Sequence, residues 1–406
     1  MNQRCIIIGM SHAGIHLATA LRQQGWQGEI MMIGNEALLP YHRPPLSKAY
    51  LKDHADVTLI HPESNFEKFQ IQYRLNTQVT AISVQDKQVI LDSGERLSFD
   101  KLALCTGARV RRLNIAGASL EGVHYLRDIN DAQHLRKDLA TAKKVVIIGA
   151  GFIGLEIAAV LTQCGLQVDI LEAGQRILAR NLDEEMSAYF MDLHARHGVN
   201  IHTDVEVTAL HGKTRVEKVS CADGREYVAD AVIVGIGVVP NAELAAEAGL
   251  LVDNGIVVNE YAQSSHADIV AAGDCTFFPS AHLKRSIRLE CLANAADQAR
   301  VAVATLCGQQ IAHQAVPWFW SEQYTQRLQI AGLCDDFDQV IERQHTNGSF
   351  SRLYLQGQQL LMSVCINAPQ DFIASKQLIA QQAYLDLSAL KMGNDLKSCV
   401  LKQEVF

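Results

Sequence analysis

The feature that most constrains this chain is a glycine-rich turn near its middle, at residues 145–156, which reads VVIIGAGFIGLE. A short β-branched run ends at Gly149, and a stretch with helical spacing follows. In a strand–turn–helix unit of this kind, Gly149 permits the sharp turn, Gly151 lets the backbone approach a pyrophosphate, and Gly154 lets helix and strand pack closely. The unpaired N–H groups at the start of the helix then face the phosphates. The segment therefore predicts a dinucleotide-binding α/β unit, in preference to a glycine-rich turn of some unrelated α/β domain.

The residue after the next predicted strand indicates which nicotinamide nucleotide is bound. The run VDIL at residues 168–171 ends in Glu172, where a carboxylate would hydrogen-bond both ribose hydroxyls of an adenosine. A carboxylate gains a charge-assisted hydrogen bond from a 2′-hydroxyl but is repelled by a 2′-phosphate. NADH is therefore favoured over NADPH, and only a phosphate contact from Arg176 would reverse that preference.

A second copy of the pattern opens the chain. A short strand leads into Gly9, Ser11 and Gly14 before a helical stretch, with Ser11 where the second glycine would stand. Serine is small enough to let phosphates approach. After the next strand, either Asn35 or Glu36 is placed to hold a ribose. Two such units need two dinucleotides, and one bound FAD with one exchangeable nicotinamide nucleotide is the economical choice.

The segments between and after these turns supply further candidate contacts. Residues 38–51 carry paired prolines, which predict an extended segment over a ligand, and Lys48 then places a cation along that ligand unless it is simply solvated. Each unit closes with an apolar strand that runs into a glycine turn, at residues 100–109 and 230–241. A further strand ends in Gly-Asp, and the helix after it would point its positive end at the ligand. The candidates from these segments are Thr106, Gly107, Gly237, Asp274 and Leu292.

These patterns predict an α/β protein with two Rossmann-like dinucleotide-binding domains, for FAD and NAD, and a C-terminal α+β domain. Because the strand ending in Asp274 follows the completed second unit, we expect the chain to return there to its first domain. The expected boundaries are 1–112 with 239–316 for the FAD-binding domain, 113–238 for the NAD-binding domain and 317–406 for the C-terminal domain. In the C-terminal domain, strands are expected at 328–331, 339–342, 350–355 and 360–366, and a helix is expected at 371–382.

Composition excludes other classes of protein. The 406 residues are 48% hydrophobic and 20% charged, which suits two or three domains, each with its own core. A formal net charge of −8 argues against nucleic acid as the main partner. We find neither the roughly 20-residue apolar run that spans a bilayer nor a secretion signal. The ten cysteines show no C-x-x-C or metal-site spacing. We therefore expect a cytoplasmic protein without a bound metal.

The segments, in this order, resemble the FAD- and NAD-dependent ferredoxin and rubredoxin reductases of bacterial oxygenase systems over almost the whole chain. The most particular motifs are RPPLSK at 43–48, GxGxxGLE at 149–156, GDC at 273–275 and PWFWSxQY at 317–324. The last motif separates this group from most other two-dinucleotide reductases.

The resemblance implies where the two nucleotides bind. The flavin contacts would be Gly9, Ser11, Ala13, Gly14, Asn35, Glu36, Arg43, Lys48, Val79, Thr106, Gly107, Arg127, Asp274, Leu292 and Trp320. The nicotinamide-nucleotide contacts would be Gly149, Gly151, Phe152, Ile153, Gly154, Glu156, Glu172 and Gly237. Asp274 is expected on the ribityl chain and Glu156 beside the nicotinamide ring. Members of the group often carry aspartate where Asn35 stands.

The implied reaction is hydride transfer from NADH to FAD, followed by two single-electron steps to a [2Fe–2S] ferredoxin or a rubredoxin. The flavin supplies the chemistry, so the protein need only align the rings, tune charge and exclude water. Lys48 and Glu156, the expected catalytic residues, would form an ion pair near the reactive edge of the flavin, although each alone is more often part of a structural salt bridge. Trp318 or Trp320 would either cover the flavin or fill a domain interface.

An acidic ferredoxin would need basic residues near its docking site, and Lys284, Arg285 and Arg288 are the candidates.

Of three other classes of two-dinucleotide protein, one is disfavoured and two remain open. The disfavoured class is the disulfide reductases, which need a cysteine pair near the flavin, because residues 40–51, where that pair would lie, contain no cysteine. A monodehydroascorbate-type reductase needs no such cysteine. A flavin-bound scaffold of the apoptosis-inducing-factor kind shares the architecture without the same catalytic role.

Overall fold

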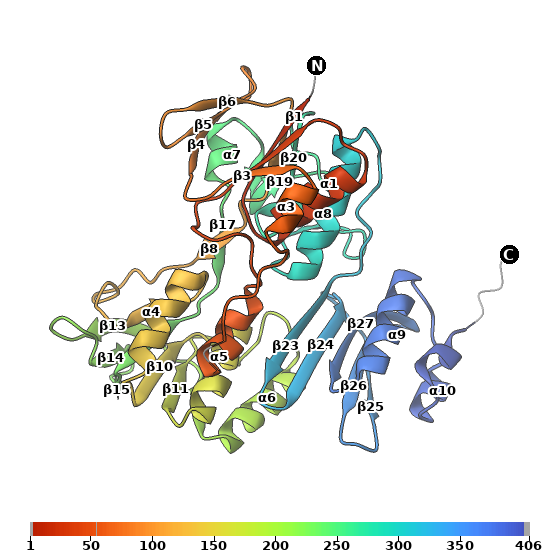
Figure 1. Cartoon of the computed structure of the whole chain (residues 1–406). Helices are drawn as coiled ribbons and strands as arrows, with labels where there is room; N and C mark the ends of the chain where they lie inside the picture. The colour runs from red at the N-terminus through yellow and green to blue at the C-terminus, as the bar shows by residue number, and fades with distance from the viewer. Residues whose placement is uncertain (1–2, 54, 402–406) are drawn as a thin grey trace.

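The computed structural model describes residues 3–53 and 55–401, and its N-terminal part is built on a parallel sheet (Figure 1). The strand order is β20-β7-β1-β2-β3. The bounds are β1 (Arg4–Ile8), β2 (Glu29–Ile33), β3 (Ile71–Arg74), β7 (Lys101–Leu104) and β20 (Ile269–Ala271). Strand β20 pairs with β7 although more than 160 residues separate them in the chain. The chain therefore does return to its first sheet after the second unit is complete.

Both faces of this sheet are covered, which explains its apolar strands. Alternate side chains of a strand point to opposite faces. Cys5 and Ile7 pack with helices α1 (His12–Gln23) and α8 (Leu292–Leu306). Ile6 and Ile8 pack on the other side, with the antiparallel strands β4 (Val79–Ser83), β5 (Gln88–Leu91) and β6 (Arg96–Ser98).

The second unit repeats this plan with the order β12-β11-β10-β16-β9, again all parallel. Its strands are β9 (Val123–Tyr125), β10 (Lys144–Ile148), β11 (Gln167–Leu171), β12 (Val199–His202) and β16 (Ala231–Val234). Helices α4 (Ile129–Leu139), α5 (Phe152–Gln163) and α6 (Glu184–Arg196) cover one face, and β13 (Val207–His211), β14 (Lys218–Cys221) and β15 (Glu226–Val228) the other. The predicted fold class, with its two Rossmann-like units, is confirmed.

The C-terminal part is an antiparallel sheet in the order β23-β24-β27-β26-β25, drawn in blue in Figure 1. Its strands are β23 (Trp318–Gln323), β24 (Gln326–Gly332), β25 (Gln339–Gln344), β26 (Phe350–Gln356) and β27 (Gln359–Ile366). Helix α9 (Pro369–Ala380) packs on one face, while the other contributes Leu328 and Val364 to the core of the second unit. Strand β23 was not expected from the sequence, nor were α10 (Leu387–Lys391) and η2 (Leu396–Cys399) in the tail.

Shorter elements connect these parts. Strand β8 (Ala108–Val110) pairs with β17 (Val238–Pro240) where the chain crosses between the first two units. The others are η1 (Pro44–Ser47), α2 (Ala49–Lys52), α3 (Ser64–Lys68), α7 (Glu243–Glu247), β18 (Val252–Asp253), β19 (Gly255–Val257), β21 (Thr276–Pro279) and β22 (Ser286–Ile287). The exact domain boundaries stay a prediction. Within the described part of the chain, we find no helix with the length and apolar character needed to cross a membrane.

The extended conformation predicted around the paired prolines is wrong, because Pro44 and Pro45 begin a 3-10 helix, η1. Proline is tolerated in the first turn of a helix, where its missing N–H would have had no partner. The result is a compact turn that places Ser47 and Lys48 side by side.

The C-terminal sheet is clamped to the second unit by a buried arginine. The side chain of Arg352 on β26 is only 6% exposed, and it donates hydrogen bonds to Asp183 Oδ2 at 3.0 Å, to Glu342 Oε2 at 2.9 Å and to Glu185. Asp183 also caps α6 by accepting from the Met186 N–H. One guanidinium thus joins the sheet to the first turn of α6.

Replacing this arginine should weaken the whole interface. We expect Arg352→Ala to lower the free energy of unfolding by about 2–3 kcal/mol, because it removes a buried side chain and its charge-assisted hydrogen bond to the half-buried Asp183. Urea unfolding followed by circular dichroism measures this. Arg327 on β24 pairs with Glu322 at 3.8 Å with both side chains exposed, so Arg327→Ala should cost less than about 1 kcal/mol. Equal effects of the two changes would contradict the clamp.

Candidate functional site

A cavity of about 410 Å³ lies where the three parts of the chain meet. This volume is in the range of small-molecule and cofactor sites. Sixteen of the predicted site residues line it, from all three parts: Gly9, Ser11, Ala13, Asn35, Glu36, Arg43, Lys48, Thr106, Gly107, Arg127, Phe152, Ile153, Glu156, Asp274, Leu292 and Trp320. The structure therefore brings together positions that lie more than 300 residues apart in the chain.

The first glycine turn forms a close-packed cradle at one end of the cavity. A Cβ at Gly9 would lie 2.0 Å from the carbonyl oxygen of Cys105, and one at Gly14 would lie 2.0 Å from that of Gly9. Gly14 does not line the cavity itself but lets α1 start directly behind the turn. His12 is only 6% exposed, and its Nε2 has no hydrogen-bond partner among the described residues. Burial lowers the pKa of His12 to about 3, so the imidazole is neutral at pH 7 and has a polar atom available for a ligand.

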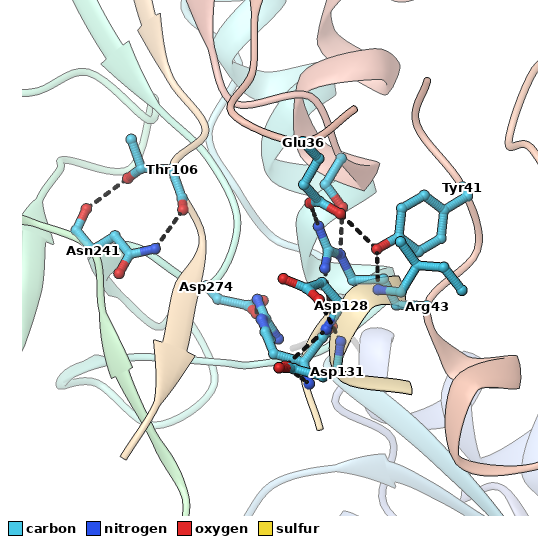
Figure 2. A network of polar contacts seen from close by, with 11 residues as sticks. Glu36, Tyr41, Arg43, Thr106, Asp128, Asp131, Asn241 and Asp274 are labelled. Atoms are coloured by element: carbon cyan, nitrogen blue, oxygen red, sulfur yellow. Dashed lines mark hydrogen bonds and ion pairs between the residues drawn. The ribbon is translucent and has the colours of Figure 1, made fainter. Parts of the chain in front are cut away.

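A polar network closes the cavity beside this turn (Figure 2). The carboxylate of Glu36 accepts hydrogen bonds from Arg43 and, at 2.6 Å, from the Tyr41 hydroxyl. Arg43 also donates to Ser11 Oγ at 3.1 Å. In contrast, no hydrogen bond joins the Asn35 amide to another described residue. Of the two ribose candidates, Glu36 is thus bonded within the protein while Asn35 is exposed at the edge of the cavity.

The opposite wall is held by one contact between the first and second units, and by a second contact at the point where the chain crosses between them. Arg127 donates to Asp274 Oδ2 at 3.1 Å. Thr106 Oγ1 donates to the Asn241 carbonyl at 2.6 Å, and the Asn241 amide donates back to the Thr106 carbonyl at 2.9 Å (Figure 2). Asn241 was not among the predicted residues, although it follows the closing turn of the second unit.

The predicted Lys48–Glu156 ion pair is present, with Nζ and Oε2 2.6 Å apart. Glu156 is 5% exposed, and it also accepts from Ser47 Oγ at 2.8 Å and from Ser321 Oγ at 2.7 Å. Both serines were missed as site residues although each stands inside a quoted motif, RPPLSK or PWFWSxQY. Their donation matters because a buried carboxylate needs partners for its remaining lone pairs.

Aromatic side chains form the wall contributed by the C-terminal sheet. Phe152 at the start of α5 packs against Phe319, with ring centroids 4.6 Å apart. Trp320 lines the cavity, whereas Trp318 stacks on Trp320 and packs against Phe372 of α9. Trp320 is therefore placed to cover a ligand in the cavity, whereas Trp318 fills the interface with α9.

The second glycine turn forms a separate, more open cradle. Its three glycines do not line the cavity, although Phe152 and Ile153 between them do. A Cβ at Gly154 would lie 2.4 Å from the Gly149 carbonyl oxygen, whereas one at Gly151 would have no atom within 4 Å. Glu172 accepts hydrogen bonds from the Ala150 N–H at 2.7 Å and the Gly174 N–H at 2.8 Å, which fixes its carboxylate beside the turn. Gly237 adopts a φ of +98° in the segment that enters β17.

The possible phosphate contact from Arg176 is not available in this structure. Its guanidinium donates to the Leu182 carbonyl, to Ser187 Oγ at 2.9 Å and to the Ala179 carbonyl at 3.2 Å. The side chain is therefore bonded to the loop that leads into α6, and Glu172 remains the charged residue beside the turn.

One prediction is corrected by the geometry, and another is left open. The side chain of Val79 is 8% exposed, packs in the apolar core beneath the first sheet and does not line the cavity, so its flavin contact stays a prediction. The basic patch proposed for docking is largely neutralised, because Arg285 makes two hydrogen bonds to Asp335, at 2.6 and 2.7 Å, and Arg288 pairs with Glu290. Only Lys284 of that group has no ion pair among the described residues.

Two cysteines line the cavity, but they do not form a redox-active disulfide. Cys105 and Cys291 are free thiols, and burial raises the pKa of Cys291 to about 11 and that of Cys105 well above its usual value. Both are therefore protonated at pH 7 and are poor nucleophiles.

Two glycine cradles on twin parallel sheets, with a shared cavity and no thiolate, define a two-dinucleotide oxidoreductase. Residues 3–305 match the family described as pyridine nucleotide-disulphide oxidoreductase, and residues 318–400 match the reductase C-terminal domain. The chain belongs to this oxidoreductase family and carries the reductase C-terminal domain. The use of FAD and NADH predicted from the sequence is thereby confirmed.

The chain is similar to several reductases over nearly its whole length. It is 40% identical to the putidaredoxin reductase of Pseudomonas putida, with 94% of this chain and 92% of that protein covered. It is 42% identical to the rhodocoxin reductase of Rhodococcus erythropolis, with 93% and 89% covered. The reductase in the crystal structure of a covalent putidaredoxin reductase–putidaredoxin complex superimposes with a TM-score of 0.92 at 39% identity, covering 96% of each chain. These findings confirm the resemblance stated from the motifs.

The open space at Gly151 yields a direct test of the second cradle. Gly151→Ala should leave the melting temperature and flavin content unchanged but raise the KM for NADH, because the added methyl points to where the pyrophosphate must approach. Gly154→Ala should disturb the turn itself, since its Cβ would meet the Gly149 carbonyl. Steady-state kinetics and thermal melting separate the two. Normal NADH binding in Gly151→Ala would show that the nucleotide does not follow this turn.

Glu172 should set the preference for NADH. We expect Glu172→Gln to raise the KM for NADH about tenfold, since a hydrogen bond to a charged group contributes about 1.5–3 kcal/mol, and to lower the KM for NADPH by removing repulsion. The ratio of kcat/KM for the two nucleotides is the measurement. Arg176→Gln is the control and should leave that ratio unchanged. An unchanged ratio in Glu172→Gln would place the ribose elsewhere.

Proposed function

We propose that this protein passes electrons from NADH, through bound FAD, to a small iron–sulfur protein, a [2Fe–2S] ferredoxin or a rubredoxin, that serves an oxygenase. The observation that carries the proposal is the pair of half-buried Lys48 and buried Glu156 in a cavity shared by both nucleotide units, where the lining thiols Cys105 and Cys291 are free. It is supported by the named relatives, which are a putidaredoxin reductase and a rhodocoxin reductase. One solved relative is bound to putidaredoxin itself.

The cavity residues fit a flavin dinucleotide. The cradle at Gly9 and Gly14 has no room for side chains, and the unpartnered Nε2 of His12 lies beside it. Arg127 and Asp274 lie on the wall opposite, where a polyhydroxyl chain would find both a donor and an acceptor. Bound here, FAD supplies the acceptor for hydride and the donor for single electrons.

The chain's own residues then position the nicotinamide nucleotide. The second cradle, at Gly149 to Gly154, receives the pyrophosphate at the start of α5, and Glu172 hydrogen-bonds the adenosine ribose. This directs the nicotinamide end along α5 toward Ile153 and Glu156, which line the shared cavity. Phe152, Phe319 and Trp320 keep water out of that space.

Lys48 and Glu156 balance charge at the centre of the site. The ammonium stabilises negative charge that develops near it, and the carboxylate keeps the resting site close to neutral. Because Lys48 comes from the first unit and Glu156 from the second, the pair forms only when both units are docked. The alignment of the two nucleotides and the charge balance are thus controlled by one contact.

We also propose a cytoplasmic location. All ten cysteines are free thiols, and six of those in the two nucleotide units are buried or half-buried. Unpaired cysteines in such number are typical of proteins in a reducing compartment.

The proposed role requires dependence on a carrier protein. Purified protein with NADH should reduce ferricyanide by itself, but should reduce cytochrome c only when a [2Fe–2S] ferredoxin or a rubredoxin is added, because a one-electron carrier must relay the electrons. Absorbance at the cytochrome c band measures this. Boiled carrier protein is the control. Equal cytochrome c reduction with and without a carrier would contradict the proposal.

A further inference from the structure

Strand β23 carries two buried polar side chains that neither its aromatic packing nor its backbone pairing explains. Ser321 is fully buried and Gln323 is 1% exposed, although the preceding residues of the strand are Trp318, Phe319 and Trp320. Burying a hydroxyl and a carboxamide is unfavourable unless both are hydrogen-bonded. Their hydrogen bonds connect the cavity at one end to helix α6 at the other.

The hydrogen bonds run from Gln323 to the ion pair. Gln323 Nε2 donates to Ser321 Oγ at 3.2 Å, and Ser321 Oγ lies 2.7 Å from Glu156 Oε1. An ionised carboxylate only accepts hydrogen bonds, so the Ser321 hydroxyl proton must point to Glu156. Its other oxygen, Oε2, is taken by Ser47 and Lys48.

The chain of hydrogen bonds continues into α6. His194 is fully buried, with Nε2 2.8 Å from Gln323 Oε1 and Nδ1 3.1 Å from the Tyr324 hydroxyl. Because a carboxamide oxygen carries no proton, Nε2 must be the protonated nitrogen. Burial lowers the pKa of His194 to about 4, so the ring is neutral and Nδ1 accepts from Tyr324. Every donation from Tyr324 onward therefore points to Glu156.

We propose that Ser321 is a positioning residue for the Lys48–Glu156 pair, itself oriented by Gln323, His194 and Tyr324. The inference rests on the function proposed above. With Oε1 held by Ser321 and Oε2 by Ser47 and Lys48, the carboxylate is fixed at both oxygens, so it presents one orientation to the cavity. The C-terminal sheet thus takes part in the arrangement of the site and does more than cover it.

The alternative is that these polar groups only satisfy one another at a domain interface. A structural role of that kind would change stability but would not act on the reaction through Glu156. The two roles are separated by comparing the effect of losing the Ser321 hydroxyl in two backgrounds, one with the carboxylate and one with Glu156→Gln. Coupling between the two sites is the signature of positioning.

The first measurement is the stopped-flow rate of reduction of bound FAD by NADH, without any carrier protein. Ser321→Ala should lower the limiting rate about tenfold while the Kd for NADH stays within about twofold, because misorientation of a site group acts on the chemical step. Ser321→Thr keeps the hydroxyl and should recover most of the rate. In the Glu156→Gln background, Ser321→Ala should have no further effect.

The second measurement is the melting temperature of the FAD-loaded protein. Ser321→Ala should lower it by about 2–4 °C, and by less in the Glu156→Gln background, because the lost partner is already changed. Ser375→Ala is the matched control: Ser375 is buried on α9, and its hydroxyl has no hydrogen-bond partner among the described residues. This control should change neither the rate nor the coupling.

The outcomes are distinct. If bound FAD in the wild-type protein is not reduced by NADH, the proposed function fails, and the role of Ser321 in it fails as well. If the wild type is reduced normally and Ser321→Ala matches it, or lowers the rate equally in both Glu156 backgrounds, only the inference is overturned.

Discussion

The structure depends on the burial of one carboxylate. Removing the charge of Glu156 from water costs several kcal/mol unless cations and hydrogen-bond donors replace the lost hydration. Those donors come from η1 and the residue after it, and from β23, whereas Glu156 itself lies on α5. Each part of the chain supplies something that the charge needs, so the three parts are held together at the point where the cofactor cavity lies. Assembly and chemistry share the same contacts.

The two nucleotide units use one plan but differ in how closed their cradles are. In both, a Cβ at the third glycine would meet the carbonyl oxygen of the first, at 2.0 Å for Gly14 and 2.4 Å for Gly154, so only glycine lets the helix start there. The middle position differs. Ser11 is bonded to Arg43, which covers the first turn, whereas Gly151 faces open space. This difference suits a nucleotide that stays bound in the first unit and one that exchanges in the second.

Much of the fold and site was predictable because the relevant restraints are local. Gly9 and Gly149 each adopt the left-handed φ that their turns require, and such a requirement is visible in a single short stretch. The Lys48–Glu156 pair was predictable only through the family resemblance, because 108 residues separate its members.

The failures arise from contacts made at long range. The sequence makes Arg285 a docking candidate because it does not show that Asp335 lies beside it. Pro44 was read as extended although a first helical turn accepts it equally well. Ser321 was missed since its significance depends on Glu156, which is remote in the chain.

The pairing of β8 with β17 has a consequence for the ancestry of this architecture. Arg109 lies opposite Val239, so the polypeptide enters and leaves the intervening segment at adjacent points. An inserted module whose two ends are neighbours adds no span for its host to bridge, and hosts accept such insertions readily. In topological terms the nicotinamide unit is thus an insertion, and its exchange for another unit would add no span to the flavin unit as long as the contacts of Glu156 and Asp183 were kept.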